Sequence, residues 1–423
     1  MSKNLLKNEN LKTKIPNSIL KWSLGILILS FGSQYFTEIE SNWINSYLKY
    51  YTSSGNNSFV SLMVSLNNII GTIFFILYGV ISDNIRGKLG RRLPFILLGT
   101  FGTALVLFSL PFVYSTIVLL ILAGVVSPIL SNGMHMAGKV IVPDLIPQNK
   151  RGRLNTFVTL MANLASIIVW ILSLSLLPPG SEIYSYEVHK LFILSGCFVL
   201  ILTGLQAFFL LRENKIETPP RNWRLDLKNL INIKEFRENK NFFVVFLGSL
   251  FVLMSQFAYL PFLLILVQEI DFNLVQILLA LPIVGGVIGL CLFLVLKYID
   301  KIGRKKVVLT GLTIAPIGSI ILILNSSTFN LITGLAIMMP LVIIINIGVD
   351  TWIQDLLPEE SRGKYMGFVR LAHGIGQTPG VILAGILADL FGIMYIFLAA
   401  GIILWCSIPI FLKAKESLKI NTN

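Results

Sequence analysis

Long apolar segments, separated by shorter polar ones, run along almost the whole chain. Each apolar segment is close to the roughly 20 residues that an α-helix needs to cross a bilayer. A polar continuation can extend the first span through Tyr47. The pattern predicts an all-α membrane protein with twelve transmembrane helices, at residues 20–37, 59–80, 94–113, 116–142, 155–177, 190–211, 241–267, 274–296, 306–325, 329–352, 364–388 and 391–412.

The longest polar interval divides these spans six and six. We expect an N-terminal six-helix bundle at residues 1–211, a cytoplasmic linker with an amphipathic helix at 212–240, and a C-terminal six-helix bundle at 241–423. The composition agrees, with 55% apolar residues, 13% charged residues and a mean hydropathy of +0.79. A soluble chain of this length would carry more charge.

The distribution of basic residues predicts the topology and explains the net charge of +13. If alternate loops are assigned to the inside, 30 of the 34 Lys and Arg residues fall there or in the two terminal segments. The positive-inside rule then places both termini in the cytoplasm, with the chain as a multi-pass protein of the plasma membrane. This pattern argues against a nucleic-acid partner. The three cysteines all lie in apolar runs, so we expect neither disulfides nor a metal site.

Two short segments repeat at a nearly fixed distance along the chain. The sequence VPDLIPQNKRGRL, at 142–154, matches QDLLPEESRGKYM, at 354–366, with Asp144 and Arg151 each 211 residues before Asp355 and Arg362. In each copy the proline is expected to end a span, because it cannot continue a helix. Such self-similarity indicates two related halves.

Two charged hairpins occupy corresponding places in the halves. The first lies within GVISDNIRGKLGRRLPFILLG, from Gly79 to Gly99, and the second within KYIDKIGRKKV, from Lys297 to Val307. Their charges cannot lie in hydrocarbon, so each hairpin is expected at a membrane surface.

Twelve spans in two halves, internal termini and these paired hairpins resemble the major facilitator superfamily over essentially the whole chain. The first hairpin departs from the family pattern at Asn84, which replaces a basic residue, and in its greater length before Gly90. The resemblance implies two pseudo-symmetric bundles that rock around a central solute site, usually in a monomer.

The longer hairpin, ending in GRRLPFI, is similar to that of disaccharide/proton symporters and of glycoside–pentoside–hexuronide cation symporters. Three further patches are similar to the same groups: Gly32 to Glu38, Asn132 through Lys139 to Asp144, and Asn346 to Gly348. Lys139 replaces the Arg of that pattern, which removes a planar, two-pronged donor. The resemblance implies proton-coupled transport of a sugar or glycoside.

The same resemblance implies that gating residues lie at the two hairpins and after spans four and ten. Asp83 and Arg91 would lock the halves together, and Asp144 would hold a hairpin arginine; the alternative is a charge cluster that only sets topology. The expected set is Asp83, Arg86, Arg91, Arg92, Asp144, Arg151, Asp300, Arg304, Asp355 and Arg362. Lys139 and Asp350 hold equivalent places in the repeat. They are expected to form an ion pair when the cytoplasmic end of the cavity closes. The alternative is that Lys139 extends to the lipid headgroups and Asp350 bonds locally.

Polar side chains inside spans are costly and are therefore candidates for function. For proton coupling we expect Glu38, because a carboxyl in a partly dry cavity can take up a proton near neutral pH, while Glu40 is expected to point elsewhere. The alternative is a span that ends near Thr37 and leaves both glutamates at the surface. For solute binding we expect Gln34, Asn132, His135, Asn163, Gln256, Tyr259, Asn346, Arg370, His373 and Gln377, although a lone intramembrane histidine is more often a packing residue.

No phosphate-binding loop, paired Cys/His metal spacing or nucleophile elbow is present, so we expect no cofactor and no enzyme activity. The leading hypothesis is a secondary transporter that takes up a sugar or glycoside with a proton. The alternatives are an exporter of amphipathic compounds or of another small metabolite, and a membrane transferase. The transferase would need a carboxylate/histidine cluster, and His189 with Glu182 and Glu187 is too loose a grouping.

Overall fold

The chain is described here from a computed structural model, which carries no ligand. The structure describes residues 17–52, 56–85, 87–146, 148–176, 185–211, 239–269, 282–291, 293–294, 302–324, 328–356, 369 and 372–416. All regular elements in these ranges are helices. Ten of them are long and apolar enough to cross a membrane. They coincide with ten of the expected spans, and the full number of twelve remains a prediction.

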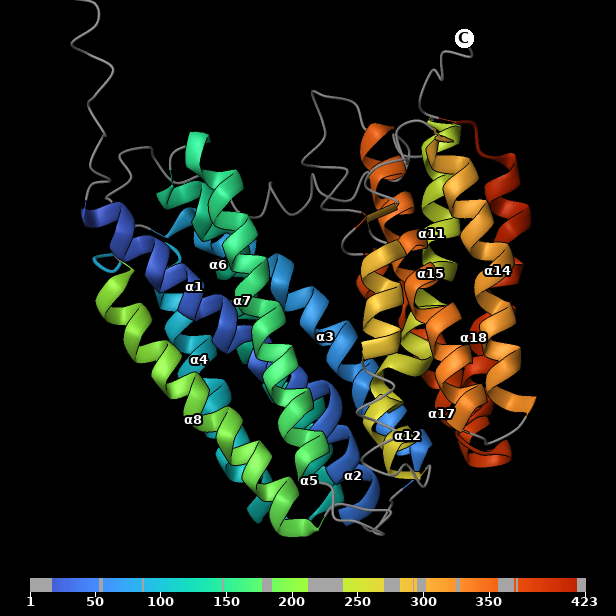
Figure 1. The fold of residues 1–423 in the computed structure, drawn as a ribbon. Helices are drawn as coiled ribbons and strands as arrows, with labels where there is room; N and C mark the ends of the chain where they lie inside the picture. The colour runs from blue at the N-terminus through green and yellow to red at the C-terminus, as the bar shows by residue number, and fades with distance from the viewer. Residues whose placement is uncertain are drawn as a thin grey trace, which may run out of the picture.

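The first half of the chain forms one bundle, on the left of Figure 1. Its helices are α1 (Asn17–Glu38), the π-helical turn η1 (Ile39–Ile44), α2 (Asn45–Tyr51), α3 (Asn57–Asn84), α4 (Leu93–Ser109), the 3₁₀ turn η2 (Leu110–Phe112), α5 (Thr116–Ile121), the π-helical turn η3 (Leu122–Val126), α6 (Ser127–Leu145), α7 (Gln148–Ser175) and α8 (Tyr186–Leu210).

The second half forms the other bundle, on the right of Figure 1. Its helices are α11 (Lys240–Tyr259), the 3₁₀ turn η4 (Leu260–Phe262), α12 (Leu263–Glu269), α14 (Arg304–Leu324), α15 (Thr328–Asp355), α17 (Thr378–Phe391) and α18 (Tyr395–Lys413). A shorter apolar helix, Pro282–Cys291, lies within the expected eighth span.

Local sequence explains several helix ends. Asn56 and Asn239 cap α3 and α11, because the Oδ1 atom of each accepts a hydrogen bond from a backbone N–H three residues later. Helices α6 and α15 end at the repeated Asp-Leu-x-Pro segments, as the sequence predicts.

Helix pairing follows the same plan in both bundles. In the first bundle α4 packs against α6 and α8, and α1 packs against α7 and α8. In the second bundle α14 packs against α15 and α18, and α11 packs against α17 and α18. The pseudo-symmetry expected from the repeated segments is therefore confirmed in the packing.

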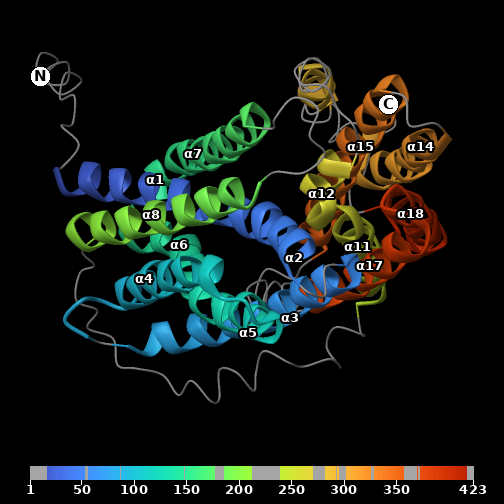
Figure 2. The same cartoon turned by 90° about the horizontal axis from the view of Figure 1, so that it is seen from below.

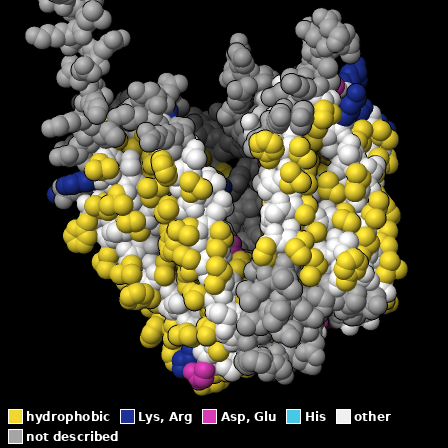
Figure 3. Space-filling view, in the orientation of Figure 1, with side chains coloured by type: hydrophobic (Ala, Val, Ile, Leu, Met, Phe, Trp, Pro, Cys, Tyr) yellow, Lys and Arg dark blue, Asp and Glu magenta, His cyan; other side chains and the backbone are white. Residues whose placement is uncertain are grey.

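The two bundles lie apart at one end and meet at the other. The hairpin between α3 and α4, with the last turns of α6 and α15, lies at the upper end in Figure 1, which we call the hairpin end. The space-filling view shows a notch between the bundles there (Figure 3). At the opposite end α2 contacts α12, and α3 packs along α17; the view from below shows these helices between the halves (Figure 2). We call this the closed end.

Candidate functional site

A polar cavity lies against the first bundle, between α1, α3, α6 and α7. Its volume is about 610 Å³. Hydroxyl, amide and imidazole groups make up much of its polar lining, and it contains three of the residues expected to bind solute: Gln34, Asn132 and His135. Lys139 and Glu40 also line it.

A second cavity, of about 510 Å³, lies against the second bundle. Four expected residues line it: Gln256, Asn346, His373 and Gln377. A smaller cavity of about 160 Å³ shares Asn132 with the first cavity and Gln377 with the second. The expected residues from the two halves thus line three neighbouring cavities that share lining residues.

Each half supplies a histidine held by a serine of its first long helix. Ser33 Oγ lies 2.9 Å from His135 Nδ1, and Ser249 Oγ lies 2.7 Å from His373 Nε2. Each imidazole also contacts a phenylalanine of that same helix, Phe36 for His135 and Phe246 for His373. These contacts orient both rings on opposite walls of the central space.

Amide groups next to the histidines are also held in place. Asn346 Nδ2 donates to Gln256 Oε1 at 2.9 Å, and Asn132 Nδ2 donates to the carbonyl oxygen of Pro128 at 2.9 Å. Such fixed donors and acceptors suit a solute rich in hydroxyl groups.

Two of the expected solute-binding residues lie elsewhere. Tyr259 is buried in the core of the second bundle, where its ring stacks on Phe397. Asn163 is exposed and does not line the described cavities, whereas Asn155 of the same helix does. The faces of α7 and α11 cannot be assigned from hydropathy, because lipid and protein core are both apolar.

The first helix does not end near Thr37. It continues through η1 and α2 to Tyr51, as the polar continuation predicted. Glu38 is bound inside the first bundle and does not line the described cavities. The expectation that Glu40 points elsewhere is wrong, since Glu40 lines the first cavity.

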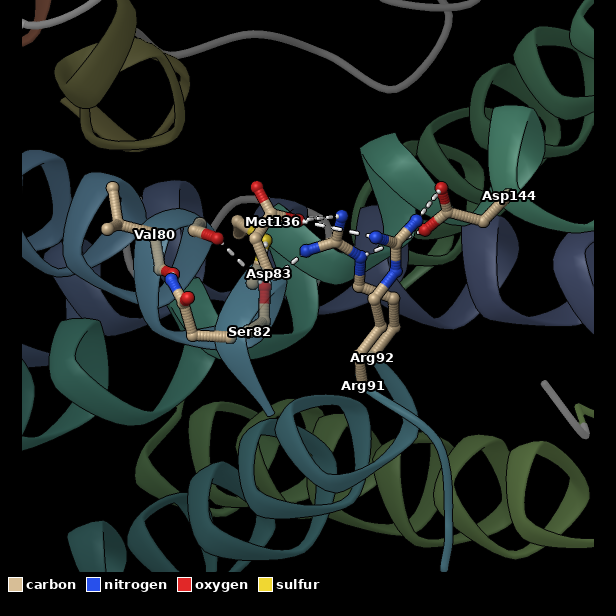
Figure 4. Close-up of polar contacts among 9 residues, drawn as sticks. Val80, Ser82, Asp83, Arg91, Arg92, Met136 and Asp144 are labelled. Atoms are coloured by element: carbon tan, nitrogen blue, oxygen red, sulfur yellow. Dashed lines mark hydrogen bonds and ion pairs between the residues drawn. The ribbon is translucent and has the colours of Figure 1, made fainter. Parts of the chain in front are cut away.

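The first hairpin contains a compact ion-pair cluster, drawn in Figure 4. Arg92 is 5% exposed; its Nε donates to Asp144 Oδ2 at 2.9 Å, and its Nη2 pairs with Asp83. Arg91 also pairs with Asp144. Asp144 therefore holds two hairpin arginines, as the resemblance implied.

In this structure the cluster lies inside one half. Asp83 pairs with Arg92 and Arg91 of its own bundle. The start of the eleventh span, where the expected lock between the halves would reach, lies outside the described residues. Arg151 likewise bonds locally, through Nε to the carbonyl oxygen of Ile146 at 2.8 Å.

The second half repeats the central contact of this cluster. Arg304 Nε lies 3.2 Å from Asp355 Oδ2. In both halves a glycine with positive φ comes directly before an arginine that pairs with the aspartate of the repeated segment: Gly90, at 88°, before Arg91, and Gly303, at 95°, before Arg304. A side chain in place of either glycine would strain this backbone conformation. Four expected residues lie outside the described residues: Arg86, Asp300, Arg362 and Arg370.

Polar side chains of the first span and its continuation join the halves at the closed end. Asn45 Nδ2 donates to the carbonyl oxygen of Pro261 at 2.9 Å, and Ser46 Oγ donates to Gln268 Oε1 at 2.6 Å. Lys49 pairs with Glu269. These contacts carry no sequence signal, because their partners lie more than 200 residues apart.

Asp389, near the end of α17, adds a contact of a different kind. Its two carboxylate oxygens accept hydrogen bonds from the backbone N–H groups of Asn57 and Ser58, at 2.8 Å each. These N–H groups have no partner within α3, whose positive dipole end also favours an acidic group. Close packing accompanies this contact, since a Cβ on Gly385 would lie 2.4 Å from Ser61 Oγ.

Two similar helical bundles around a shared polar space, closed at one end, define a multi-pass membrane transporter. The sequence model of the Major Facilitator Superfamily matches residues 23–299 and 246–422, and the chain belongs to this superfamily. It is accordingly a transporter and not an enzyme. Within the described residues no group of three or more His, Cys, Asp or Glu side chains could hold a metal ion.

Three solved structures illustrate the similarity of the fold. A D-xylose-proton symporter has a TM-score of 0.70 and 14% identity, over 96% of this chain and 100% of that chain. The nucleoside transporter NupG has a TM-score of 0.72 and 13% identity, over 92% and 99%. The xylose transporter XylE from E. coli, in a partially occluded inward open conformation, has a TM-score of 0.66 and 15% identity, over 95% and 98%. At these identities the similarity concerns the fold alone.

One sequence relative is an uncharacterized transporter of Buchnera aphidicola subsp. Schizaphis graminum. It is 34% identical over 99 residues, which make up 23% of this chain and 25% of that protein. The match thus spans about a quarter of the relative's length.

Proposed function

We propose that this transporter takes up a sugar or glycoside together with a proton, as a monomer in the plasma membrane. The observation that carries the proposal is the polar space between the halves, where fixed amide, hydroxyl and imidazole groups converge from both bundles. A neutral, hydroxyl-rich solute fits such a lining, because each hydroxyl group can both donate and accept a hydrogen bond.

The fold neighbours agree with a small polar solute. Two of them are named as transporters of D-xylose and of nucleosides, and both solutes are rich in hydroxyl groups. The first hairpin and the patches on the first, fourth and tenth spans support membership of the sugar–cation symporters within the superfamily. An exporter of amphipathic compounds remains the second candidate, and the amide-rich lining favours it less.

We further propose that the hairpin end faces the cytoplasm, because the basic loops and both terminal segments are predicted there. The structure then corresponds to an inward-facing state. The two bundles, at 1–211 and 241–423, would move as units joined by a linker at 212–240. The loop ion-pair clusters would re-pair across the halves when the hairpin end closes.

Transport in reconstituted vesicles tests this function. Purified protein in liposomes with an imposed pH gradient is offered labelled sucrose, maltose, D-xylose, methyl glucosides and uridine. We expect accumulation of at least one sugar or glycoside, abolished by a protonophore. Uptake of uridine alone, or extrusion of a hydrophobic dye without sugar movement, would contradict the proposal.

Lys139 and Asp350 are proposed to form a gate pair when the hairpin end closes. In this structure they line cavities of opposite halves, and Lys139 Nζ lies 5.6 Å from the ring centroid of Phe75. Lys139→Asp or Asp350→Lys alone is expected to slow sugar uptake strongly, because like charges would then face each other. The double exchange should restore the initial rate, and failure of that rescue would contradict direct pairing.

A further inference from the structure

The first membrane-spanning segment changes its helical geometry where its two glutamates lie. Helix α1 ends at Glu38, and the π-helical turn η1 carries the chain from Ile39 to Ile44 before α2 begins. A π turn contains more residues than an α turn, so it rotates the side chains that follow, and such turns are frequent at functional sites. Glu38 and Glu40, two positions apart, point in different directions and contact different helices, α7 for Glu38 and α3 and α6 for Glu40.

Both carboxylate oxygens of Glu38 accept hydrogen bonds from side chains of its own bundle. Its Oε1 accepts hydrogen bonds from Gln34 Nε2 at 3.1 Å and from Ser166 Oγ at 2.7 Å, and its Oε2 accepts one from Asn42 Nδ2 at 3.1 Å. These contacts fasten α1 to α7. Since Glu38 does not line the described cavities, its contacts indicate a structural role.

Glu40, in contrast to Glu38, faces a cavity and has described donors on only one of its carboxylate oxygens. It lines the first cavity, and its described hydrogen bonds both end on Oε1: Asn67 Nδ2 of α3 donates at 3.0 Å, and Ser127 Oγ of α6 donates at 3.0 Å. Among the described residues no side chain donates to Oε2, and no basic side chain forms an ion pair with this carboxyl group. Oε2 is therefore the oxygen available to a proton that arrives through the cavity.

Other ionisable groups face the same space. His135 and Lys139 of α6 line the first cavity, and His373 and Asp350 line the second. The lining residues from α3 include amides and a hydroxyl but no ionisable group. Both histidines are held by serines, Lys139 lies against Phe75, and Asp350 lies on the opposite wall. Glu40 is the carboxyl group of the first cavity that lies on the segment leading to the closed end.

That segment connects the cavity directly to the contacts between the halves. Five and six residues after Glu40, Asn45 and Ser46 donate hydrogen bonds to Pro261 and Gln268 of the other bundle. A change of charge at Glu40 therefore acts on a short, irregular helix whose far end holds the closed end together. Closing a cavity around an ionised carboxylate costs more free energy than closing it around the neutral acid, because the charge loses its contact with water.

We propose that Glu40, rather than Glu38, binds and releases the coupling proton. The inference rests on the proposed proton-coupled function. One proton from the side where the cavity is open forms an O–H bond at Oε2, which takes the carboxyl from one negative charge to neutral. After the halves have moved, that bond breaks and the proton leaves on the other side, while Asn67 and Ser127 hold Oε1 throughout.

Infrared difference spectra of the reconstituted protein test the assignment without any solute. On acidification a protonating carboxylate produces the carbonyl band of a carboxylic acid. The chain has 21 acidic residues, so other carboxyl groups also contribute to this band. We expect one component of the band to be present in the wild-type protein and in Glu38→Gln and to be missing in Glu40→Gln. A spectrum of Glu40→Gln that equals the wild-type spectrum, with a component missing in Glu38→Gln, would overturn the proposal.

Transport measurements with the same two variants give a second readout. The probe is whichever sugar of the panel the wild-type vesicles exchange. Glu40→Gln should keep exchange at equal pH and lose accumulation driven by a pH gradient, whereas Glu38→Gln should keep both. Accumulation by Glu40→Gln, or accumulation that requires sodium, would overturn the proposal. If the wild-type protein exchanges no sugar at all, the proposed function fails, and the infrared band still decides the role of Glu40.

Discussion

Replacing Asp389 with alanine is expected to favour a conformation in which the two bundles separate at the closed end. Asp389 of the second bundle accepts two hydrogen bonds from the start of α3 in the first bundle. The variant removes both acceptors and leaves the N–H groups of Asn57 and Ser58 to water. Loss of such a cap costs about 1 to 2 kcal/mol, which corresponds to a roughly five- to thirty-fold change in an equilibrium.

The shift can act on conformation without unfolding either half, because the contact joins the bundles and does not lie inside one. When the hairpin end closes and the opposite end opens, α3 and α17 are expected to separate at that end, so the cap would be absent. Asp389→Ala therefore destabilises only the state with the cap. The same argument extends to Gly385, where a larger side chain would meet Ser61 across the interface.

Distances between spin labels at the closed end measure this shift. Tyr114 and Phe329, which are 93% and 76% exposed, provide one labelling position in each half of a cysteine-free background. The longer-distance population should grow in Asp389→Ala. Glu187→Ala is the matched control, since Glu187 is an exposed acidic residue at the first turn of α8, within one bundle. An unchanged distance distribution in Asp389→Ala would contradict the role of the cap.

Replacing Arg92 with alanine is expected to destabilise the first bundle by about 1.5 to 3 kcal/mol, the usual contribution of a hydrogen bond to a charged group, because Asp83 is more than half exposed and Asp144 keeps Arg91. Arg92 is buried, and its guanidinium group donates hydrogen bonds to Asp144, Asp83 and Ser82. Without it, Arg91 is the one arginine among the described residues that still pairs with Asp144, and the end of α6 loses one of its two described ion pairs with the hairpin.

Thermal unfolding of the purified protein in detergent measures this effect. Arg92→Ala should lower the Tm clearly, and Arg304→Ala should act in the same direction through Asp355 in the second half. Lys88→Ala is the control, because Lys88 is an exposed basic residue of the same hairpin. A wild-type Tm for Arg92→Ala would show that the cluster contributes little to stability.

Much of the fold follows from the sequence, because a bilayer imposes simple rules. Only helices satisfy the backbone in hydrocarbon, so apolar length locates the spans, and charged hairpins must lie at the surface. The repeat also carried structural information. Gly90 and Gly303 both have positive φ, and Asp144 and Asp355 both hold an arginine of their own half.

The site was less predictable, for identifiable physical reasons. Gln34 lines the cavity, whereas Glu38, four residues later in the same helix, is held by Ser166 of α7. Glu40 follows Ser33 and Thr37 at helical spacing, and all three line the cavity. Tyr259 has a polar end, but a side chain in this position of α11 packs into the core. Asn67 and Asn68 were visible as adjacent amides within an apolar run, and they line the cavity.

The central claim is that solute and proton cross together. The most direct test places the reconstituted protein in lightly buffered vesicles without a pH gradient and adds the sugar that the panel identifies, while external pH and sugar uptake are recorded together. We predict that the external medium becomes more alkaline as the sugar enters, and that Glu40→Gln abolishes the pH change. Sugar entry without any movement of protons would contradict the account.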